Sequence, residues 1–306
     1  AEKGQEALKE LSKKSQQEIN DIVHQMSMAA VDQHMHLAKL AYDETGRGIY
    51  EDKSIKNLYA SEYIWNSIKD NKTVGIIGED KQKGLTYVAE PIGVICGVTP
   101  TTNPTSTTIF KAMIAIKTGN PIIFAFHPSA QQSSKHAAKV ILEAAIKAGA
   151  PKDCIQWIEI PSIEATKQLM NHKDIALVLA TGGSGMVKSA YSTGKPALGV
   201  GPGNVPTYIE KTAHTKRAVN DIIGSKTFDN GMICASEQVM VVDKEVYSDV
   251  VKEFKLHQTY FVNKNELQQL EDAIMNEDKT AVKPDIVGKS AVDIAKLSGI
   301  SVPEKT

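Results

Sequence analysis

The chain has 306 residues, with 35 Lys and Arg against 36 Asp and Glu, so its formal net charge is −1 at pH 7. Hydrophobic residues make up 42% of the sequence and charged residues 23%, values of an ordinary globular protein that argue against intrinsic disorder. The balanced charge, with no dense Lys/Arg cluster, gives no reason to expect a nucleic acid partner. Three cysteines are too few for a disulfide framework and indicate a reducing cytoplasm.

The sequence shows no pattern typical of a membrane protein or of an exported one. Its apolar runs are mostly shorter than the roughly 18 residues of a membrane helix, and the longer ones carry Lys or polar residues. Residues 1–6 are charged and lack the apolar core of a signal peptide. These observations, together with the few cysteines, predict a soluble cytoplasmic protein. At about 150 residues per domain, its length predicts two domains.

The first 90 residues change from a helical to an extended pattern. Apolar residues at three- and four-residue steps predict helices over residues 8–26, 28–42 and 54–68. Residues 74–77 and 85–88 are short β-prone stretches on either side of a charged turn that contains glycine. These two stretches predict a hairpin or paired arm.

From residue 92 onward, apolar strands alternate with helices. Strands are expected at residues 92–98, 121–126, 154–158 and 175–180. Helices are expected after them, at residues 106–117, 130–148 and 162–170 and in a short segment that ends at Tyr191. Near-continuous apolar strands with crossover helices predict an α/β fold whose parallel sheet is covered on both faces. Ligands of such sheets bind at the carboxyl ends of the strands, here the loops after residues 98, 126 and 180.

Beyond residue 230 the pattern continues with a strand and three helices. They are expected at residues 238–242, 245–254, 265–275 and 292–297. Asn263 followed by Glu266 resembles a capping box at the start of one of these helices.

Cys234 is the strongest candidate for chemistry. It follows a turn-forming Asp-Asn-Gly at residues 229–231 and precedes an apolar strand, so we expect it at the end of an element, near a loop. A thiolate there would be a strong nucleophile, whereas most free cysteines are small buried hydrophobes. Position alone leaves both interpretations of Cys234 open. Cys96 and Cys154 lie within or at the start of apolar strands, which favours core packing.

A second candidate is the segment Thr-Pro-Thr-Thr-Asn-Pro-Thr at residues 99–105, between a strand and a helix. Its two prolines prevent regular structure, while the hydroxyl groups and the Asn103 amide supply hydrogen-bond donors. This composition favours recognition of a polar ligand at a helix N-terminus, although a capped turn has the same composition. The side-chain N–H₂ of Asn103 could stabilise a developing oxyanion.

Two glycine-rich segments, at residues 181–185 and 199–204, are the third candidate. Neither matches G-x-G-x-x-G or a P-loop, so each alone is weak evidence for phosphate binding. The first follows a strand and opens a helix, where backbone N–H groups could meet a pyrophosphate. His127 ends a strand at the same expected edge, where it either lines a cofactor groove or forms a plain turn. No Cys/His group has zinc spacing, so no metal site is predicted.

Taken in this order, the segments resemble the aldehyde dehydrogenase superfamily. More closely they resemble its CoA-acylating branch, found as the N-terminal half of bifunctional aldehyde–alcohol dehydrogenases. The resemblance covers essentially the whole chain and is carried by residues 90–106, 180–183, 194–197, 199–204 and 226–238.

The resemblance implies a Rossmann-like NAD-binding domain over residues 1–225, with a β arm at about 73–89, and the start of a catalytic domain over 226–306. It implies that Cys234 attacks a short aldehyde, with acetaldehyde expected, and that hydride passes to NAD. Coenzyme A then cleaves the thioacyl enzyme to acyl-CoA, while Asn103 and the N–H of Cys234 hold the oxyanion. The residues expected to line the cofactor are Pro100, Thr101, Thr102, Asn103, His127, Gly182, Gly183, Ser184 and Gly201.

One departure from the wider family bears on the chemistry. Hydrolytic aldehyde dehydrogenases carry a Glu as general base for water, and the matching position here is Gly199. Without that carboxylate, water is poorly activated, which favours transfer to a CoA thiol over hydrolysis. A hydrolytic enzyme, an acyl-phosphate reductase and an inactive NAD-binding or assembly fragment are the alternatives.

The family also implies features outside these residues. Its members continue well past residue 306, so the catalytic domain is expected to be incomplete here and the isolated chain could be inactive. Homo-oligomers are expected at full length, and bifunctional members carry a fused iron-dependent alcohol dehydrogenase domain.

Overall fold

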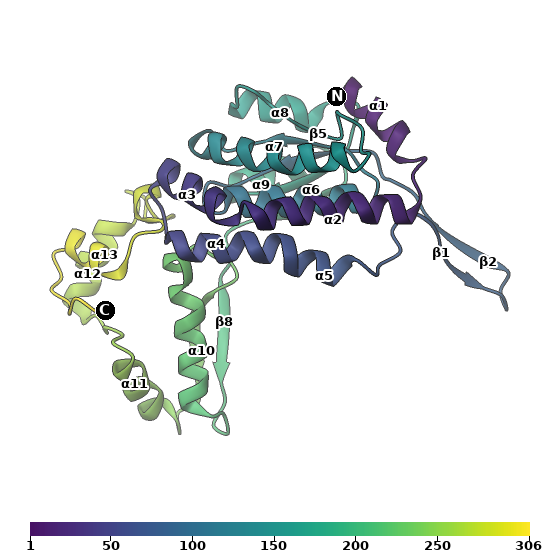
Figure 1. The fold of residues 1–306 in the computed structure, drawn as a ribbon. Helices are drawn as coiled ribbons and strands as arrows, with labels where there is room; N and C mark the ends of the chain where they lie inside the picture. The colour runs from purple at the N-terminus through teal and green to yellow at the C-terminus, as the bar shows by residue number, and fades with distance from the viewer. The chain divides into compact units, whose positions relative to one another are not determined.

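The computed structural model describes all 306 residues, which form two compact units (Figure 1). The first unit comprises Ala1–Gly46 and Lys53–Pro202, and the second comprises Arg47–Asp52 and Gly203–Thr306. The expected division at residues 225/226 does not coincide with this boundary. The reason is that β8 (Val205–Ile209) pairs with β9 (Glu237–Val242) and therefore belongs to the second unit.

A five-stranded parallel sheet forms the centre of the first unit. Its strands, in spatial order, are β5 (Ile155–Trp157), β4 (Ile122–Ala125), β3 (Val94–Val98), β6 (Ile175–Thr181) and β7 (Ala197–Val200). The chain builds outward from β3 to β5, then crosses back to place β6 on the other side of β3. The order therefore reverses between β3 and β6, which makes their carboxyl ends a topological switch point. This arrangement confirms the predicted α/β fold, although no strand was predicted at β7.

Helices cover both faces of this sheet. They are α6 (Pro104–Lys117), α7 (Gln131–Lys147), α8 (Ile163–Asn171) and α9 (Ser184–Tyr191). The first two pack on one face and the last two on the other. Successive side chains of a strand point to opposite faces, so Ile95 of β3 lies in the first core and Cys96 in the second.

The N-terminal helices form a further layer over α6 and α7, and Figure 1 shows α2 running alongside α7. The layer consists of α2 (Gln16–Asp32) and α3 (His34–Thr45), whereas α1 (Glu2–Leu11) packs against β3. The helical run expected over residues 8–26 is split, because Ser15 starts a new helix with a capping box to Glu18. The helix expected over residues 54–68 is also interrupted, by a π turn at Tyr59–Tyr63 between α4 (Tyr50–Leu58) and α5 (Ile64–Ile68).

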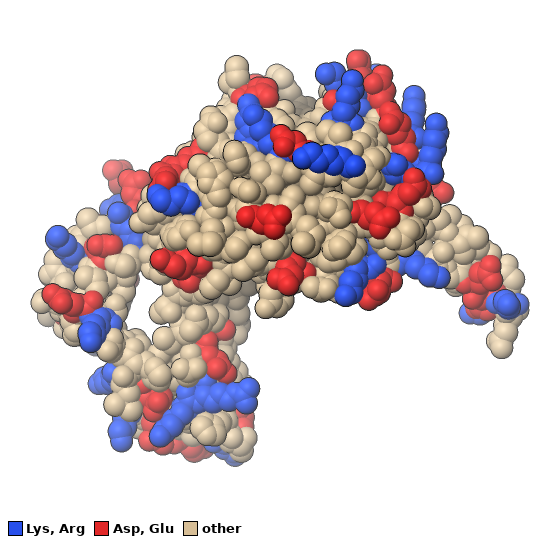
Figure 2. Space-filling view, viewed as in Figure 1, with Lys and Arg blue, Asp and Glu red and all other residues tan.

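The predicted arm is an antiparallel hairpin of β1 (Gly75–Asp80) and β2 (Leu85–Ala89). Figure 1 shows it projecting from the rest of the first unit, and Figure 2 shows acidic and basic groups together at its tip. Asp80 and Lys83 form an ion pair there at 3.6 Å.

The second unit is built on the parallel pair β8 and β9. Helices α10 (Thr215–Thr227) and α11 (Tyr247–Leu256) pack with β8 around a small apolar core. Two further helices, α12 (Lys264–Ile274) and α13 (Ala291–Leu297), follow, and Asn263 forms the predicted capping box with Glu266. In neither unit does a helix combine the length and the apolar character that a membrane span requires.

Candidate active site

The residues expected to line a cofactor lie at one edge of the first unit's sheet, which we call the cofactor edge. Parallel strands end at the same side, so the loops that follow β3, β4, β6 and β7 share this edge. Those loops hold Pro100, Thr101, Thr102 and Asn103 after β3, His127 after β4, Gly182, Gly183 and Ser184 after β6, and Gly201 after β7. The structure therefore brings these nine residues to one edge, with the β3 and β6 loops at the switch point; their cofactor role stays a prediction.

Two features of the cofactor edge suit a polar ligand. The hydroxyl oxygens of Thr99 and Thr101 are buried without a hydrogen-bond partner, which costs about 1–3 kcal/mol each unless a ligand or water satisfies them. A Cβ placed on Gly183 or Gly185 would meet nothing within 4 Å, so the start of α9 is open. A phosphate group can approach backbone N–H groups at such a helix start. The residues present therefore fit a dinucleotide.

His127 forms part of a turn, which is one of the two roles expected from the sequence. Its Nδ1 accepts a hydrogen bond from the backbone N–H of Ser129 at 3.1 Å and caps the short 3₁₀ turn Pro128–Ala130. The ring is thus held at the carboxyl end of β4. A role in lining the cofactor stays a prediction.

Gly199 lies inside β7, so the expected glycine loop at residues 199–204 is wrong in its first two residues. The backbone N–H of Gly199 donates to the Tyr191 hydroxyl at 3.0 Å. A Cβ at this position would stand 2.7 Å from Val187 and 2.8 Å from the Tyr191 ring. Residue 199 is therefore glycine because α9 packs directly on the strand, and a carboxylate side chain has no room there.

Lys111 is a buried cation that the sequence analysis missed. It lies on α6 and is 2% exposed, and its Nζ donates to Val98 O at 2.5 Å and Leu179 O at 2.7 Å. These carbonyls belong to β3 and β6, so Lys111 ties together the two strands of the switch point. Burial lowers the pKa of Lys111 to about 7, an effect that the neighbouring Cys96 partly opposes. The signal in the sequence was a single Lys on an otherwise apolar face of a helix.

We expect Lys111 to make the stability of the protein depend on pH. Its pKa is about 7 when folded against 10.5 as the ordinary value, so between these pH values the unfolded chain binds more protons. The free energy of unfolding should therefore rise with pH above 7, by up to about 1.4 kcal/mol per pH unit from this one group. Above pH 9 the raised pKa of Cys96 acts in the opposite direction, since its thiol stays protonated only in the folded state. Urea unfolding at pH 7, 8 and 9 should show a steeper rise for the parent than for Lys111→Met; parallel profiles would contradict the assignment.

Asn103 is the N-cap residue of α6, yet its side chain does not cap the helix. Its Oδ1 accepts a hydrogen bond from Lys56 Nζ at 2.6 Å, and its Nδ2 donates to Thr102 Oγ1 at 3.1 Å. The amide is thus held by two neighbours on opposite sides. The expected role of Asn103 as an oxyanion donor stays a prediction.

Cys234 is the exposed thiol of this chain, whereas Cys96 and Cys154 are buried. It lies in a turn that precedes β9, as predicted from its neighbours in the sequence. Burial raises the pKa of both Cys96 and Cys154 to about 12, which keeps those thiols protonated and unreactive. The prediction of core packing for these two residues is confirmed, and Cys234 is left as the accessible sulfur.

The segment that leads to Cys234, residues 228–234, is anchored inside the second unit, and we call it the nucleophile loop after the predicted role of Cys234. Asp229, Asn230 and Gly231 all have positive φ, at 49°, 52° and 70°, a conformation that favours Asx and Gly residues. The carboxylate of the buried Asp229 accepts a hydrogen bond from the backbone N–H of Ile49 at 2.6 Å. The backbone N–H of Asp229 donates to the Asp52 carboxylate at 2.7 Å. No pattern in the sequence indicates this anchor, because residues 47–52 are far from the loop in sequence.

Gly203 approaches the backbone of Cys234. A Cβ built on Gly203 would stand 1.9 Å from the carbonyl oxygen of Cys234 and 3.0 Å from its carbonyl carbon. Real Cβ atoms do not come this close, so only glycine at residue 203 allows these two segments of the backbone to pack against each other. The position of Cys234 therefore depends on the absence of a side chain at residue 203.

Comparison with known proteins agrees with this architecture, which belongs to the doubly wound α/β class. The model of the aldehyde dehydrogenase family matches residues 1–275. The chain is 58% identical over 287 residues to the aldehyde-alcohol dehydrogenase of Streptococcus pneumoniae, which covers 92% of this chain and 32% of that protein. It therefore spans about a third of the length of this relative.

Solved structures give the same result. The acetylating aldehyde dehydrogenase of Geobacillus thermoglucosidasius superposes with a TM-score of 0.95 at 48% identity, covering 100% of this chain and 67% of that one. A propionaldehyde dehydrogenase of Rhodopseudomonas palustris, with bound CoA and an acylated cysteine, superposes with a TM-score of 0.86 at 32% identity, covering 99% of this chain and 69% of that one. The chain belongs to the aldehyde dehydrogenase family, and its relatives include the acetylating members and the aldehyde dehydrogenase part of aldehyde-alcohol dehydrogenases.

Proposed function

We propose that the protein containing this chain is an NAD-dependent, CoA-acylating aldehyde dehydrogenase. It interconverts a short aldehyde, CoA and NAD with acyl-CoA and NADH, and acetaldehyde is the expected aldehyde. The observation that carries the proposal is Cys234, an exposed thiol on an anchored loop in a chain whose other two cysteines are buried. The acetylating relatives, one of them with an acylated cysteine and bound CoA, support the same chemistry.

In this mechanism the Cys234 thiolate attacks the carbonyl carbon of the aldehyde and forms a thiohemiacetal. The negative charge moves to the former carbonyl oxygen, where the Asn103 amide and the N–H of Cys234 donate hydrogen bonds. NAD, when bound, accepts the hydride that leaves this carbon, and Cys234 is left as a thioester. The residues that would hold NAD are those of the cofactor edge.

The thioester is then cleaved by the thiolate of CoA. Its sulfur bonds to the acyl carbon, the Cys234 sulfur leaves as thiolate, and acyl-CoA is released. Overall one aldehyde, one CoA thiol and NAD⁺ give acyl-CoA, NADH and one proton, and the reverse reaction is equally available. Water competes poorly because no carboxylate fits at residue 199, where Val187 and Tyr191 fill the space of a side chain.

The relatives also support a proposal for the whole protein. Because they are aldehyde-alcohol dehydrogenases, we propose that an iron-dependent alcohol dehydrogenase domain is fused to this one. We further propose a homo-oligomer, to which the β1–β2 hairpin contributes its exposed apolar side chains, Ile76, Tyr87 and Val88 among them.

The proposal predicts that NADH formation from acetaldehyde depends on CoA. In the intact protein that contains residues 1–306, turnover should continue with CoA and stop after about one NADH per Cys234 without it. Chromatography should find acetyl-CoA as the product, with little acetate. Acetate formed faster than acetyl-CoA would favour a hydrolytic enzyme, phosphate-dependent turnover to acetyl phosphate would favour the acyl-phosphate alternative, and NAD binding without any turnover would favour an inactive fragment.

A further inference from the structure

Helix α4 presents three polar residues, at three- and four-residue spacing, to residues 102–106, which comprise the end of the loop after β3 and the first turn of α6. Lys53 and Asn57 are buried, and Lys53, Lys56 and residues 102–106 line one shallow pocket. The Asn57 Oδ1 accepts a hydrogen bond from Thr105 Oγ1 at 2.8 Å, while its Nδ2 donates to His34 O at 3.0 Å. The part of α4 from Lys53 onward is therefore fixed against the start of α6, and both belong to the first unit.

Lys56 determines which way the Asn103 amide points. A side-chain amide has one acceptor oxygen and two N–H donors, whereas an ammonium group only donates. Since Lys56 Nζ donates to Asn103 Oδ1 at 2.6 Å, the oxygen must face Lys56 and the nitrogen must face the other way. One N–H of that nitrogen goes to Thr102 Oγ1, and the second is left for a ligand.

The charge on Lys56 has a second effect. A hydrogen bond from a cation is stronger than one between neutral groups, and it draws electron density toward the amide oxygen. Linked hydrogen bonds strengthen one another, so the N–H groups on the far side of the amide become better donors.

We infer that Lys56 is a positioning residue for the reaction, acting through Asn103. It holds the amide so that nitrogen, not oxygen, meets the oxyanion of the thiohemiacetal, and it strengthens that hydrogen bond. Without Lys56 the amide is free to rotate, and an amide oxygen turned toward the oxyanion would repel it. The inference rests on the proposed function, because it needs Asn103 to donate to a reacting oxygen.

The test compares Lys56→Met, Lys56→Arg, Asn103→Ala and the Lys56→Met/Asn103→Ala double variant in the intact protein. Lys56→Met should lower kcat for NADH formation by about ten- to a hundredfold, with KM for aldehyde and NAD within about twofold. Lys56→Arg should stay within about threefold of the parent, because it keeps a charged donor. In the double variant the loss should match that of Asn103→Ala alone, since the two residues act as one unit.

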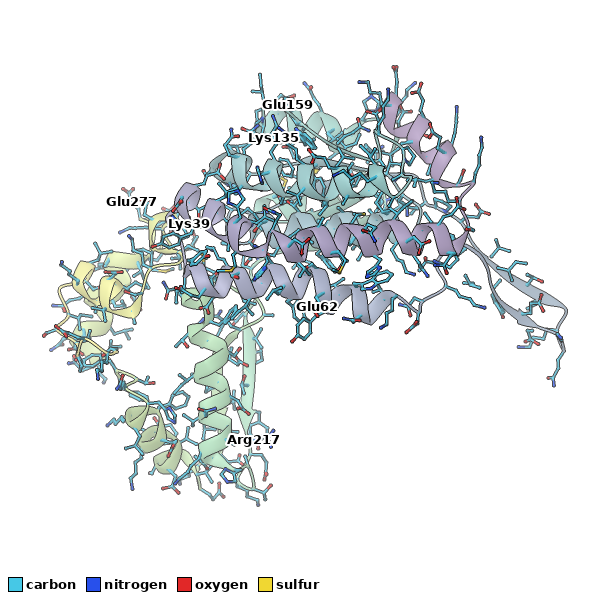
Figure 3. All side chains as sticks on the ribbon, in the orientation of Figure 1. Lys39, Glu62, Lys135, Glu159, Arg217 and Glu277 are labelled. Carbon is cyan, nitrogen blue, oxygen red and sulfur yellow. The ribbon has the colours of Figure 1, made fainter.

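Two controls separate positioning from structure. The rate at which iodoacetamide alkylates Cys234 should be the same in every Lys56 variant. Lys39→Met is the matched control, because Lys39 lies on the surface of α3 (Figure 3) and forms an exposed ion pair with Asp43; this variant should behave as the parent. Should Lys56→Met unfold, Lys56→Gln carries the same expectation with a smaller loss, since it keeps a donor without the charge.

Two outcomes would overturn the inference: full activity of Lys56→Met, or losses from Lys56→Met and Asn103→Ala that multiply. A parent protein that forms no NADH from aldehyde and CoA is a different result, because it contradicts the proposed function itself.

Discussion

Cys234→Ser is expected to abolish the CoA-dependent reaction in the intact protein while NAD still binds. A serine hydroxyl is hardly ionised at neutral pH and, unlike a thiol, needs a general base to attack a carbonyl. The loss should reach about 10⁴-fold or more in the rate of NADH formation, as is usual when a covalent nucleophile is removed. Stopped-flow absorbance at saturating NAD and acetaldehyde measures the first turnover, which should vanish together with steady-state turnover.

The matched control for this experiment is Cys154→Ala. Cys154 is buried at the start of β5, so its loss should lower stability by about 1 kcal/mol without removing activity. Titration with a thiol reagent under native conditions should count one reactive sulfur fewer in Cys234→Ser than in the parent, and the same number in Cys154→Ala as in the parent. Turnover by Cys234→Ser within about tenfold of the parent would mean that another group is the nucleophile.

The sequence predicted the elements whose pattern is local. The strands β3, β4 and β6 are short apolar runs between turn residues, and the period change near residue 73 located the hairpin arm. Cys96 and Cys154 were assigned to the core because apolar neighbours surround them, and Cys234 to a loop edge because Asp-Asn-Gly precedes it. In each case the residues that decide the conformation are adjacent in the chain.

The features that were missed depend on distant parts of the chain. Strand β7 contains Gly199, which is interpreted locally as a loop residue but lies in a strand because it pairs with Ala180 of β6. Lys111 looks like a surface lysine until folding brings Leu179 O to its ammonium group, and Asp229 gives no sign that Ile49 will be its partner. Such long-range contacts form only in the folded chain, so the exposed turn position of Cys234 could be predicted from the sequence but its anchoring could not.

Gly203→Ala is expected to lower the activity of Cys234 although Cys234 itself is not replaced. The added methyl group would overlap the Cys234 carbonyl, 1.9 Å from its oxygen, and backbone cannot yield as a flexible side chain does. The nucleophile loop must therefore move, and a displacement of about 1 Å at a reacting group can cost about a hundredfold in rate. We expect kcat to fall by about that factor while NAD binding, which is proposed for the first unit, stays as in the parent. Steady-state kinetics and a titration of NAD fluorescence quenching measure the two quantities separately.

Gly224→Ala is the control, because it makes the same chemical change in the same unit. Gly224 lies within α10 with nothing within 4 Å of a Cβ, so alanine there should raise stability by about 0.5–1 kcal/mol and leave kcat unchanged. Figure 3 shows the surface position of Arg217 on the same helix, where it forms an exposed ion pair with Asp221 at 3.6 Å. If Gly203→Ala had the same kcat as Gly224→Ala, the backbone contact between Gly203 and Cys234 would not determine the position of the sulfur. The reactivity of Cys234 would then depend on the hydrogen bonds of Asp229 alone.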